Sequence, residues 1–343
     1  MLRAVPDRDL DAILSGVSRS FYLSLAILPR AVRTQLSVAY LVARAADTIA
    51  DTRVVRAERR RALLDGLRGA IGDGRQASPI AEAVRRQLDG STQVAAERVL
   101  LERLDDCLRA LARARSDDRV RIRRVLDALI AGMERDLARF PDGGRPVALS
   151  SMEELDEHCY LAAGCVGAFW TEMAAAHLPQ VAHLADEEWI ARGVRLGKAL
   201  QMVNVIRDAP ADLATGRCYF PSPLLDKHQL TVEDLIDPAR RHRARPLVHE
   251  MRAIALAHVD AAWPYVEAVP ATSPRLRLAC IWPLWIGMAT LRLLASVEDP
   301  LDPLAPVKIR RRDVYRILAE SSLAVVANPV LRMLHRRRRA EAA

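Results

Sequence analysis

Apolar residues recur at the spacing of an α-helix over several long segments, and this periodicity constrains the fold more than any other feature of the chain. Leu36, Tyr40, Ala43 and Ala46, for example, fall on one helical face. No segment alternates between polar and apolar residues as a strand does, and no repeat of fixed period is present. We therefore expect one all-α domain over residues 1–343. Its predicted helices include Leu36 to Ile49, Leu100 to Leu137 (one or two), one capped by Ser150 or Ser151 and running to His177, Glu187 to Arg207, His249 to Ala295 (two or more) and a short one from Arg312.

The composition supports a helical chain with a substantial core. Hydrophobic residues make up 51% of the 343 positions, and glycine, at 15 residues, is scarce. The formal net charge of +8 and the pI near 9.6 favour an anionic partner. Composition alone leaves open whether that partner is nucleic acid, a membrane surface or a phosphorylated substrate.

The cysteines and the apolar runs favour a cytoplasmic protein. Five cysteines form an odd set without a C-x-x-C pair, so a disulfide framework or structural zinc site is not expected. The N-terminus lacks the apolar stretch of a signal peptide. The longest apolar run, Leu278 to Leu291, contains Pro283 and is shorter than the ~20 residues of a membrane span. We expect it to form a buried core helix.

Two pairs of aspartates share a spacing of four residues, Asp47 with Asp51 and Asp208 with Asp212. On a helix such residues lie about 5–6 Å apart at their Cβ atoms, and like charges at this spacing repel. A divalent cation between the carboxylates removes that penalty. Mg²⁺ suits them, since it binds one or two carboxylates and completes its shell with water and substrate phosphates.

A single D-x-x-x-D in a charged chain is most often a solvated surface, but the surroundings of these pairs favour a site. Both pairs follow apolar stretches with few charges, and an arginine precedes each one, Arg44 and Arg207. Carboxylates for a metal beside guanidinium groups for phosphate oxygens are what diphosphate chemistry requires.

The pairs lie within longer signatures. The first comprises Ser18-Arg19-Ser20-Phe21 and Arg44-Ala45-Ala46-Asp47-Thr48-Ile49-Ala50-Asp51. The second is His158-Cys159-Tyr160-Leu161-Ala162-Ala163-Gly164-Cys165-Val166-Gly167. The third is Gln201-Met202-Val203-Asn204-Val205-Ile206-Arg207-Asp208, closing with Asp212 and Gly216-Arg217-Cys218-Tyr219-Phe220-Pro221. In this order they resemble the squalene and phytoene synthase family. The resemblance implies an isoprenoid-synthase helical fold with a central cavity and aspartates at its mouth.

The resemblance also implies roles for individual residues. Tyr160 would face the reacting carbons and direct the proton loss that closes a cyclopropane ring. The Mg²⁺ ligands would be Asp47, Asp51, Asp208 and Asp212. The groups that hold diphosphate oxygens would be Arg19, Arg44, Arg207 and Arg217, with Asn204 as a weaker candidate.

Val307-Lys308-Ile309-Arg310 is similar to a segment that squalene synthases use in their NADPH-dependent half-reaction. No G-x-G-x-x-G fingerprint is present, so a Rossmann unit would not hold the cofactor. The resemblance thus assigns NADPH phosphates to Lys308 and Arg310. A basic surface loop is the alternative interpretation.

Other features have two interpretations each. Pro210 separates the second pair of aspartates, and a proline in a helix kinks its axis. Trp282 and Trp285 suit a hydrocarbon cavity or plain core packing. We expect His158 and His177 to be structural. The basic residues at about 335–343 suggest a solvated tail, which, preceded by Leu323 to Leu334, can also contact anionic lipid.

Together these features predict an enzyme that joins two farnesyl diphosphates head to head, with Mg²⁺ and NADPH, through presqualene diphosphate to squalene. Rival interpretations are a phytoene or dehydrosqualene synthase that omits the reduction, and an enzyme that forms presqualene diphosphate or hydroxysqualene. From other classes, a basic helical nucleic-acid-binding protein or a scaffold leaves the acidic pairs unexplained. We expect no nucleic-acid partner and, at most, peripheral contact with the inner face of a membrane.

Overall fold

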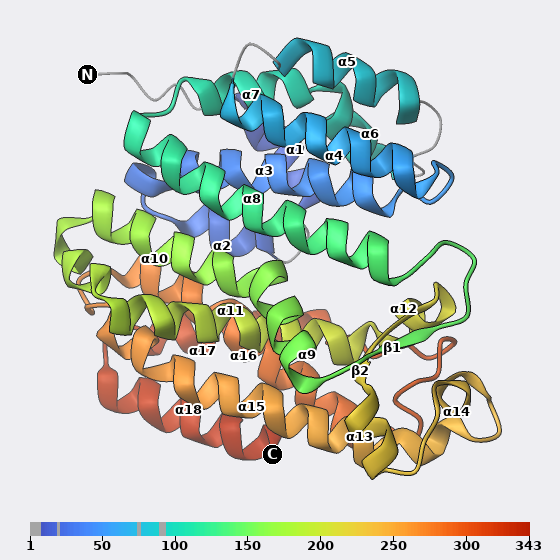
Figure 1. Ribbon diagram of the computed structural model, residues 1–343. Coiled ribbons are helices and arrows are strands. Elements are labelled where there is room, and N and C mark those ends of the chain that lie inside the picture. The colour runs from blue at the N-terminus through green and yellow to red at the C-terminus, as the bar shows by residue number, and fades with distance from the viewer. Residues whose placement is uncertain (1–7, 19–20, 74–76, 89–93) are drawn as a thin grey trace.

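Helices make up most of the chain, as the apolar periodicity predicts (Figure 1). The computed structural model describes residues 8–18, 21–73, 77–88 and 94–343. Within them lie the helices α1 (Arg8–Val17), α2 (Phe21–Ile27), α3 (Arg30–Asp51), α4 (Ala57–Gly72), α5 (Ala77–Leu88), α6 (Ala95–Glu102), α7 (Leu104–Ala112), α8 (Ser116–Arg139), α9 (Met152–Cys159), η2 (Tyr160–Gly164), α10 (Cys165–His177), η3 (Pro179–Ala185), α11 (Glu187–Arg207), α12 (Ala209–Ala214), α13 (Ser222–Lys227), α14 (Val232–Ile236), η4 (Arg241–Ala244), α15 (Arg245–Ala268), α16 (Pro274–Ser296), α17 (Arg311–Ala324) and α18 (Asn328–Ala342).

The helices are arranged in tiers that follow the chain. In Figure 1 the N-terminal helices α3 to α7 form the upper part, and α8 crosses below them. Helices α10 and α11 lie in the middle, and α15, α16 and α18 form the lower part. α11 packs along α10 and α15, and α3 packs against α8. A single connected set of buried side chains runs from α1 to α18.

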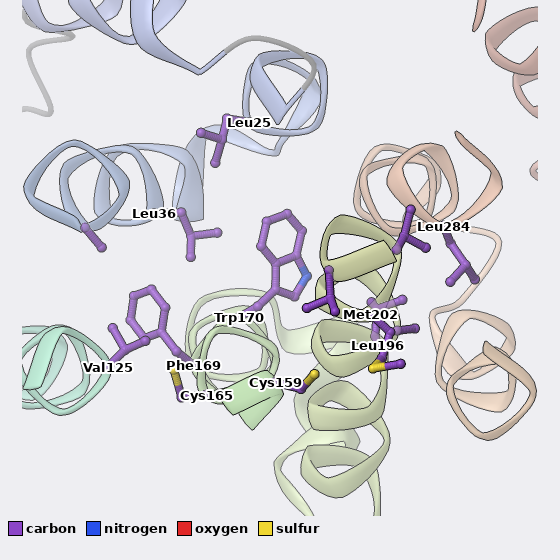
Figure 2. Close-up of a cluster of buried hydrophobic side chains, with 14 of the residues drawn as sticks. Leu25, Leu36, Val125, Cys159, Cys165, Phe169, Trp170, Leu196, Met202 and Leu284 are labelled. Atoms are coloured by element: carbon purple, nitrogen blue, oxygen red, sulfur yellow. The ribbon is translucent and has the colours of Figure 1, made fainter. Parts of the chain in front are cut away.

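Trp170 on α10 joins the upper and lower tiers. Figure 2 shows its indole beside Leu36 of α3, with the ribbon of α11 on the other side. The side chains of Trp170 and Leu36 are both buried. A large aromatic side chain buries ~150–250 Å² and so contributes strongly to the core. This contact holds the helices of the first and second acidic pairs in one packed body.

The apolar run Leu278 to Leu291 forms part of α16 and is packed inside the fold, as predicted. Among the described residues α16 is the one helix long and apolar enough to cross a bilayer, and 61% of its most apolar window is buried in the protein. Trp282 and Trp285 are buried on this helix. The Trp282 indole donates to the Ser321 hydroxyl at 3.0 Å, and the Arg338 guanidinium lies 4.8 Å from the Trp285 ring centroid. Core packing is therefore the role that the structure gives both tryptophans.

The helix predicted from Ser151 to His177 is confirmed, with a change of pitch inside it. Ser151 caps α9, since its hydroxyl accepts a hydrogen bond from the Glu154 amide at 3.2 Å. The stretch η2 is then a π-helix that begins at Tyr160, and α10 continues the helical path. π-Helical turns are rare in proteins overall, but those that occur are often found at functional sites.

Pro210 starts a helix rather than kinking one. α11 ends at Arg207, and Pro210 lies in the first turn of α12, where its missing N–H costs nothing. The Asp212 amide still donates to the Asp208 carbonyl at 3.0 Å. One helical turn therefore separates the two carboxylates, although they do not share a straight helix.

Two segments differ from the sequence-based expectation. Strands β1 (Val147–Leu149) and β2 (Arg217–Pro221) form a short parallel pair, with Val147 opposite Arg217. Neither strand is long enough to show alternation. Leu100 to Leu137 is divided among α6, α7 and α8, because Arg113 to Arg115 leave the helical path and Asp117 and Asp118 favour a new N-terminus.

The basic residues near the C-terminus lie within α18 and not in a free tail. The His335 ring is buried and stacks on Trp263, with ring centroids 3.5 Å apart. Arg339 makes two hydrogen bonds to Asp260 at 2.7 and 2.8 Å, and Arg338 pairs with Glu320. These contacts explain why the segment is ordered against the fold.

Two glycines of α11 allow its backbone to approach the preceding helices closely. A Cβ atom on Gly193 would lie 2.4 Å from the Thr171 hydroxyl oxygen and 2.8 Å from the Gly167 carbonyl oxygen. A Cβ atom on Gly197 would lie 2.1 Å from the carbonyl oxygen of Ala163 in η2. No non-bonded carbon tolerates such distances, so α11, η2 and α10 pack backbone against backbone.

This contact predicts the effect of adding one methyl group. Gly197→Ala should lower the free energy of unfolding by about 1–3 kcal/mol, the scale of overpacking, because α11 must move away from η2. Gly69→Ala in α4 is the matched control, since its new Cβ would meet no atom within 4 Å. The control should instead gain up to about 1 kcal/mol from helix propensity. Urea unfolding followed by circular dichroism measures both, and equal stability of the two variants would contradict the close packing.

Candidate active site

The four predicted aspartates line one cavity of about 380 Å³. It opens between α3, α8 and α11, with β2 at one side. The residues that line it are Arg44, Asp47, Ala50, Asp51, Leu129, Gly132, Met133, Asp136, Leu137, His158, Ala162, Gln201, Asn204, Val205, Asp208, Asp212, Arg217 and Tyr219. Acidic or basic groups come from α3, α8, β2 and the junction of α11 with α12, whereas α8 and α11 also add apolar side chains. The structure therefore brings together residues as distant in the sequence as Arg44 and Tyr219.

The first acidic pair lies on the last turns of α3. The Arg44 guanidinium donates hydrogen bonds to Asp47 and to Glu97 of α6. Burial raises the pKa of Asp47 to about 6, and the charge of Asp51 adds to the effect while Arg44 opposes it. About 40% of the Asp47 side chain is still exposed, and that surface lines the cavity. The carboxylate is thus accessible to a ligand in the cavity, but burial leaves its charged form poorly stabilised.

The second acidic pair has the same character. The Arg207 Nε atom donates to Asp208 at 2.7 Å, which holds this carboxylate at the end of α11. Burial raises the pKa of Asp212 to about 7; Arg217 lowers it, and the charges of Asp208 and Asp51 raise it further. Both pairs line the same cavity, where the charge of Asp51 at the end of α3 acts on Asp212 of α12.

Arg217 on β2 connects the two pairs. Its guanidinium donates to Asp51 at 3.0 Å. Burial lowers the pKa of Arg217, but Tyr219, Asp51 and Asp136 raise it more, so the net shift is upward. A charged arginine at this position faces both pairs and is available to a phosphate oxygen.

The donor set suits a hard cation that shares its shell with a substrate. Among the described residues no three acidic, histidine or cysteine side chains are close enough to form a metal site alone. Mg²⁺ commonly binds one or two carboxylates and takes its remaining ligands from water and phosphates. Two carboxylate pairs, in each of which burial and neighbouring carboxylates raise the pKa of one member (Asp47 and Asp212), are therefore compatible with Mg²⁺ held between protein and diphosphate.

Four polar residues of the cavity form a network that the sequence did not reveal as a site. The Tyr219 hydroxyl donates to Asp136 at 2.7 Å, and His158 Nδ1 lies 3.6 Å from the same carboxylate. His158 Nε2 is 3.2 Å from the Gln201 amide nitrogen, and the His158 and Tyr219 ring centroids are 4.2 Å apart. His158, expected to be structural, is thus part of the cavity wall.

A sequence signal for Asp136 existed, although it is weak. Asp136 recurs at helical spacing with Leu129 and Met133, so it is a carboxylate on an otherwise apolar face of α8. Its partner Tyr219 lies 83 residues further along the chain. Only the folded structure shows that the two meet.

The remaining predicted residues differ in their position relative to the cavity. Arg19 is outside the described residues. Asn204 lines the cavity and donates to Gln201 at 3.4 Å. Of the described residues near η2, His158 and Ala162 line the cavity but Tyr160 does not; its side chain is 40% exposed, and Lys198 Nζ lies 5.9 Å from its ring centroid. Lys308 and Arg310 are exposed and also lie outside the cavity lining. The roles assigned to Tyr160, Lys308 and Arg310 stay predictions.

Comparison with known proteins identifies the family. The squalene/phytoene synthase family model matches residues 14–313, which is most of the chain. The chain belongs to the squalene/phytoene synthase family. Members of this family are prenyltransferase-type enzymes of isoprenoid biosynthesis.

Individual relatives are distant. The squalene synthase of Schizosaccharomyces pombe is 25% identical over 311 residues, which cover 90% of this chain and 64%, less than two thirds, of that protein. The 15-cis-phytoene synthase of Enterobacter agglomerans is 30% identical over 146 residues, covering 43% of this chain and 44% of that protein. A solved structure of TcSQS with the ligand BPH1237 has a TM-score of 0.77 at 24% identity and covers 98% of both chains. These likenesses confirm the isoprenoid-synthase helical fold.

The network around Asp136 predicts a positioning role for two residues. Tyr219 lies two residues from Arg217 on β2, and its hydrogen bond to α8 holds the strand against the cavity. Asp136→Ala should slow diphosphate release from an isoprenoid diphosphate about 10- to 100-fold, the scale seen when supporting hydrogen bonds are lost. Asp136→Asn keeps an acceptor for the Tyr219 hydroxyl, so its KM should be close to that of the wild type.

Tyr219→Phe should resemble Asp136→Ala, because it removes the same hydrogen bond from the other side. Tyr315→Phe on α17 is the matched control, since Tyr315 is 67% exposed. Steady-state kinetics separates kcat from KM for each variant. Wild-type kinetics for Tyr219→Phe would leave the network without a role in the site.

Proposed function

We propose that the protein joins two farnesyl diphosphates head to head and converts the resulting presqualene diphosphate to squalene. The observation that carries this proposal is the cavity itself, in which two carboxylate pairs and the guanidinium groups of Arg44 and Arg217 face apolar side chains. Family membership supports the prenyltransferase chemistry. The choice of farnesyl diphosphate, and of squalene as the product, is ours.

The polar end of the cavity accounts for ionisation of the substrate. Arg44, Arg207 and Arg217 lie beside the carboxylates, where their guanidinium groups can hold diphosphate oxygens. Mg²⁺, when bound by the aspartate pairs, would neutralise charge on the departing diphosphate. Preorganised positive groups in a site shielded from water stabilise developing charge far better than bulk solvent does.

The apolar end accounts for survival of the carbocation. Leu129 and Met133 of α8, Ala162 of η2 and Val205 of α11 line this part of the cavity. Their side chains exclude water, which would otherwise capture the cation. The Tyr219 ring, which packs against the His158 ring, also lines the cavity.

The size of the cavity has a consequence for binding of the second substrate molecule. Small-molecule sites commonly enclose roughly 300–1,000 Å³, and this cavity is near the lower limit at about 380 Å³. Two C15 chains require more room. We therefore infer that the cavity walls move apart when the second farnesyl diphosphate binds.

The second candidate is a phytoene or dehydrosqualene synthase, which ends by proton loss without a reductant. The match to the Enterobacter agglomerans phytoene synthase favours it. So does the position of Lys308 and Arg310 outside the cavity, because these residues are our only candidates for NADPH phosphates. An enzyme that stops at presqualene diphosphate or releases hydroxysqualene differs only in the final step.

We place the protein in the cytoplasm, in contact with the inner face of the membrane. Squalene and its relatives are insoluble in water, so an enzyme that makes them benefits from a lipid surface that accepts them.

NADPH is the proposed reductant for the final cation, which it would quench with hydride.

One product analysis distinguishes these candidates. We expect purified protein with Mg²⁺ and farnesyl diphosphate to give presqualene diphosphate alone and squalene when NADPH is added. Geranylgeranyl diphosphate should give little hydrocarbon. Phytoene from geranylgeranyl diphosphate, or dehydrosqualene without NADPH, would replace the proposed activity by the second candidate.

The same assay tests the predicted residues outside the cavity. Lys308→Ala with Arg310→Ala should spare presqualene diphosphate and slow squalene formation, whereas the exposed pair Arg113→Ala with Arg115→Ala should change neither step. Tyr160→Phe should slow cyclopropane formation by ~10²-fold if its hydroxyl guides proton loss. Unchanged presqualene diphosphate formation would remove Tyr160 from the mechanism.

A further inference from the structure

The excess positive charge of the chain is concentrated at its C-terminal end. Residues 307–343 contain ten lysines or arginines and three acidic residues, whereas the whole chain has 51 and 43. Seven of the eight excess positive charges therefore belong to α17, α18 and the segment before them. The family model ends at residue 313, so most of this charge lies beyond the matched region.

Exposed apolar side chains gather at the turn between the same two helices. We call Leu323, Val326, Val330 and Met333 the apolar tip. Their exposed fractions are 84%, 61%, 44% and 60%. Single exposed apolar residues are normal on a protein surface, but four within eleven positions mark an interaction surface.

The outer face of α18 continues the apolar tip into a basic stripe. Val330, Met333, Arg336 and Arg337 are exposed. Met333 follows Val330 by three residues, and Arg336 and Arg337 follow Met333 by three and four, so the side chains share one face of the helix. The opposite face is buried through Leu331 and His335. The helix is thus fixed to the fold, with its apolar and basic side chains directed outward.

Ion pairs leave charge on this face for a partner. The flanking Arg332 and Arg339 pair with Glu267 and Asp260 at 2.7 Å. Arg337 pairs with Glu341 in its own helix, an exposed pair that is screened by water. Within the described part of the chain, Arg336 has no acidic group inside ion-pair distance.

We propose that the apolar tip and the basic face of α18 bind the surface of an anionic lipid bilayer. A helix that presents apolar side chains beside arginines lies in the bilayer interface, with the apolar groups among the acyl chains and the guanidinium groups at the lipid phosphates. A second copy of the chain would cover the tip but bring two basic faces together. Nucleic acid would pair with the arginines and leave the tip in water. An anionic bilayer satisfies both halves of the surface.

The surface is separate from the cavity. In Figure 1 α18 runs along the lower edge of the molecule, away from α12 and β2 beside the site. The inference therefore does not rest on the proposed reaction, and its variants leave the cavity residues unchanged. A failed binding test says nothing about the product, and a failed product test says nothing about binding.

Vesicle co-sedimentation tests the inference on the full chain. We expect binding to vesicles of phosphatidylglycerol and phosphatidylcholine that weakens as salt rises, and little binding to phosphatidylcholine alone. Leu323→Ser with Met333→Ser, and separately Arg336→Gln with Arg337→Gln, should each weaken binding about tenfold or more. The matched controls are Val120→Ser, at a position 66% exposed, and Arg113→Gln with Arg115→Gln. They should bind as the wild type does.

Three results would overturn the inference. The first is equal binding to both vesicle types. The second is a loss of binding in the control variants as large as in the test variants. The third is a wild-type protein that ignores vesicles but sediments as a dimer, together with a monomeric Leu323→Ser, Met333→Ser variant, because the tip would then be a contact between two copies.

Discussion

The structure depends on the backbone contact between α11 and the helices before it. Gly193 and Gly197 carry no Cβ, and the carbonyl oxygens of Gly167 and Ala163 occupy the space that side chains would take. The same two segments carry adjoining parts of the cavity lining, since Gln201 and Asn204 follow Gly197 on α11, and His158 and Ala162 lie just before and within η2. Packing at the glycines therefore positions this part of the lining one and two turns away.

Electrostatic repulsion between the carboxylates of the cavity favours a ligand that is a cation or carries one. Asp47 and Asp212 have pKa values of about 6 and 7, raised first by burial and further by neighbouring carboxylates. Arg44, Arg207 and Arg217 offset part of this negative charge. Such a site is less stable than an apolar one would be, and strain of this kind is common where function requires it.

Local patterns in the sequence predicted the helices and the acidic pairs. Such patterns do not predict contacts between segments that are distant in the sequence. Glu187 to Arg207 was predicted as a helix at the bounds that α11 has, because its periodicity and the break before Pro210 are local signals. The four aspartates share a cavity, as their resemblance to the family implied. The pairing of Tyr219 with Asp136 has no local signature, and β1 and β2 are too short for alternation to appear. Tyr160 lies outside the cavity lining, at the start of a π-helical stretch that no periodicity predicts.

The central claim is that the cavity binds a diphosphate through divalent cations held by both aspartate pairs. Calorimetric titration of the protein with inorganic diphosphate, with Mg²⁺ and with a chelator, tests it without reference to any product. The account predicts binding that requires Mg²⁺ in the wild type and is lost in Asp212→Asn, while the metal-free variant melts at a higher temperature because one source of repulsion is gone. Diphosphate binding of equal strength in chelator, or Mg²⁺-dependent binding that survives in Asp212→Asn, would contradict the account.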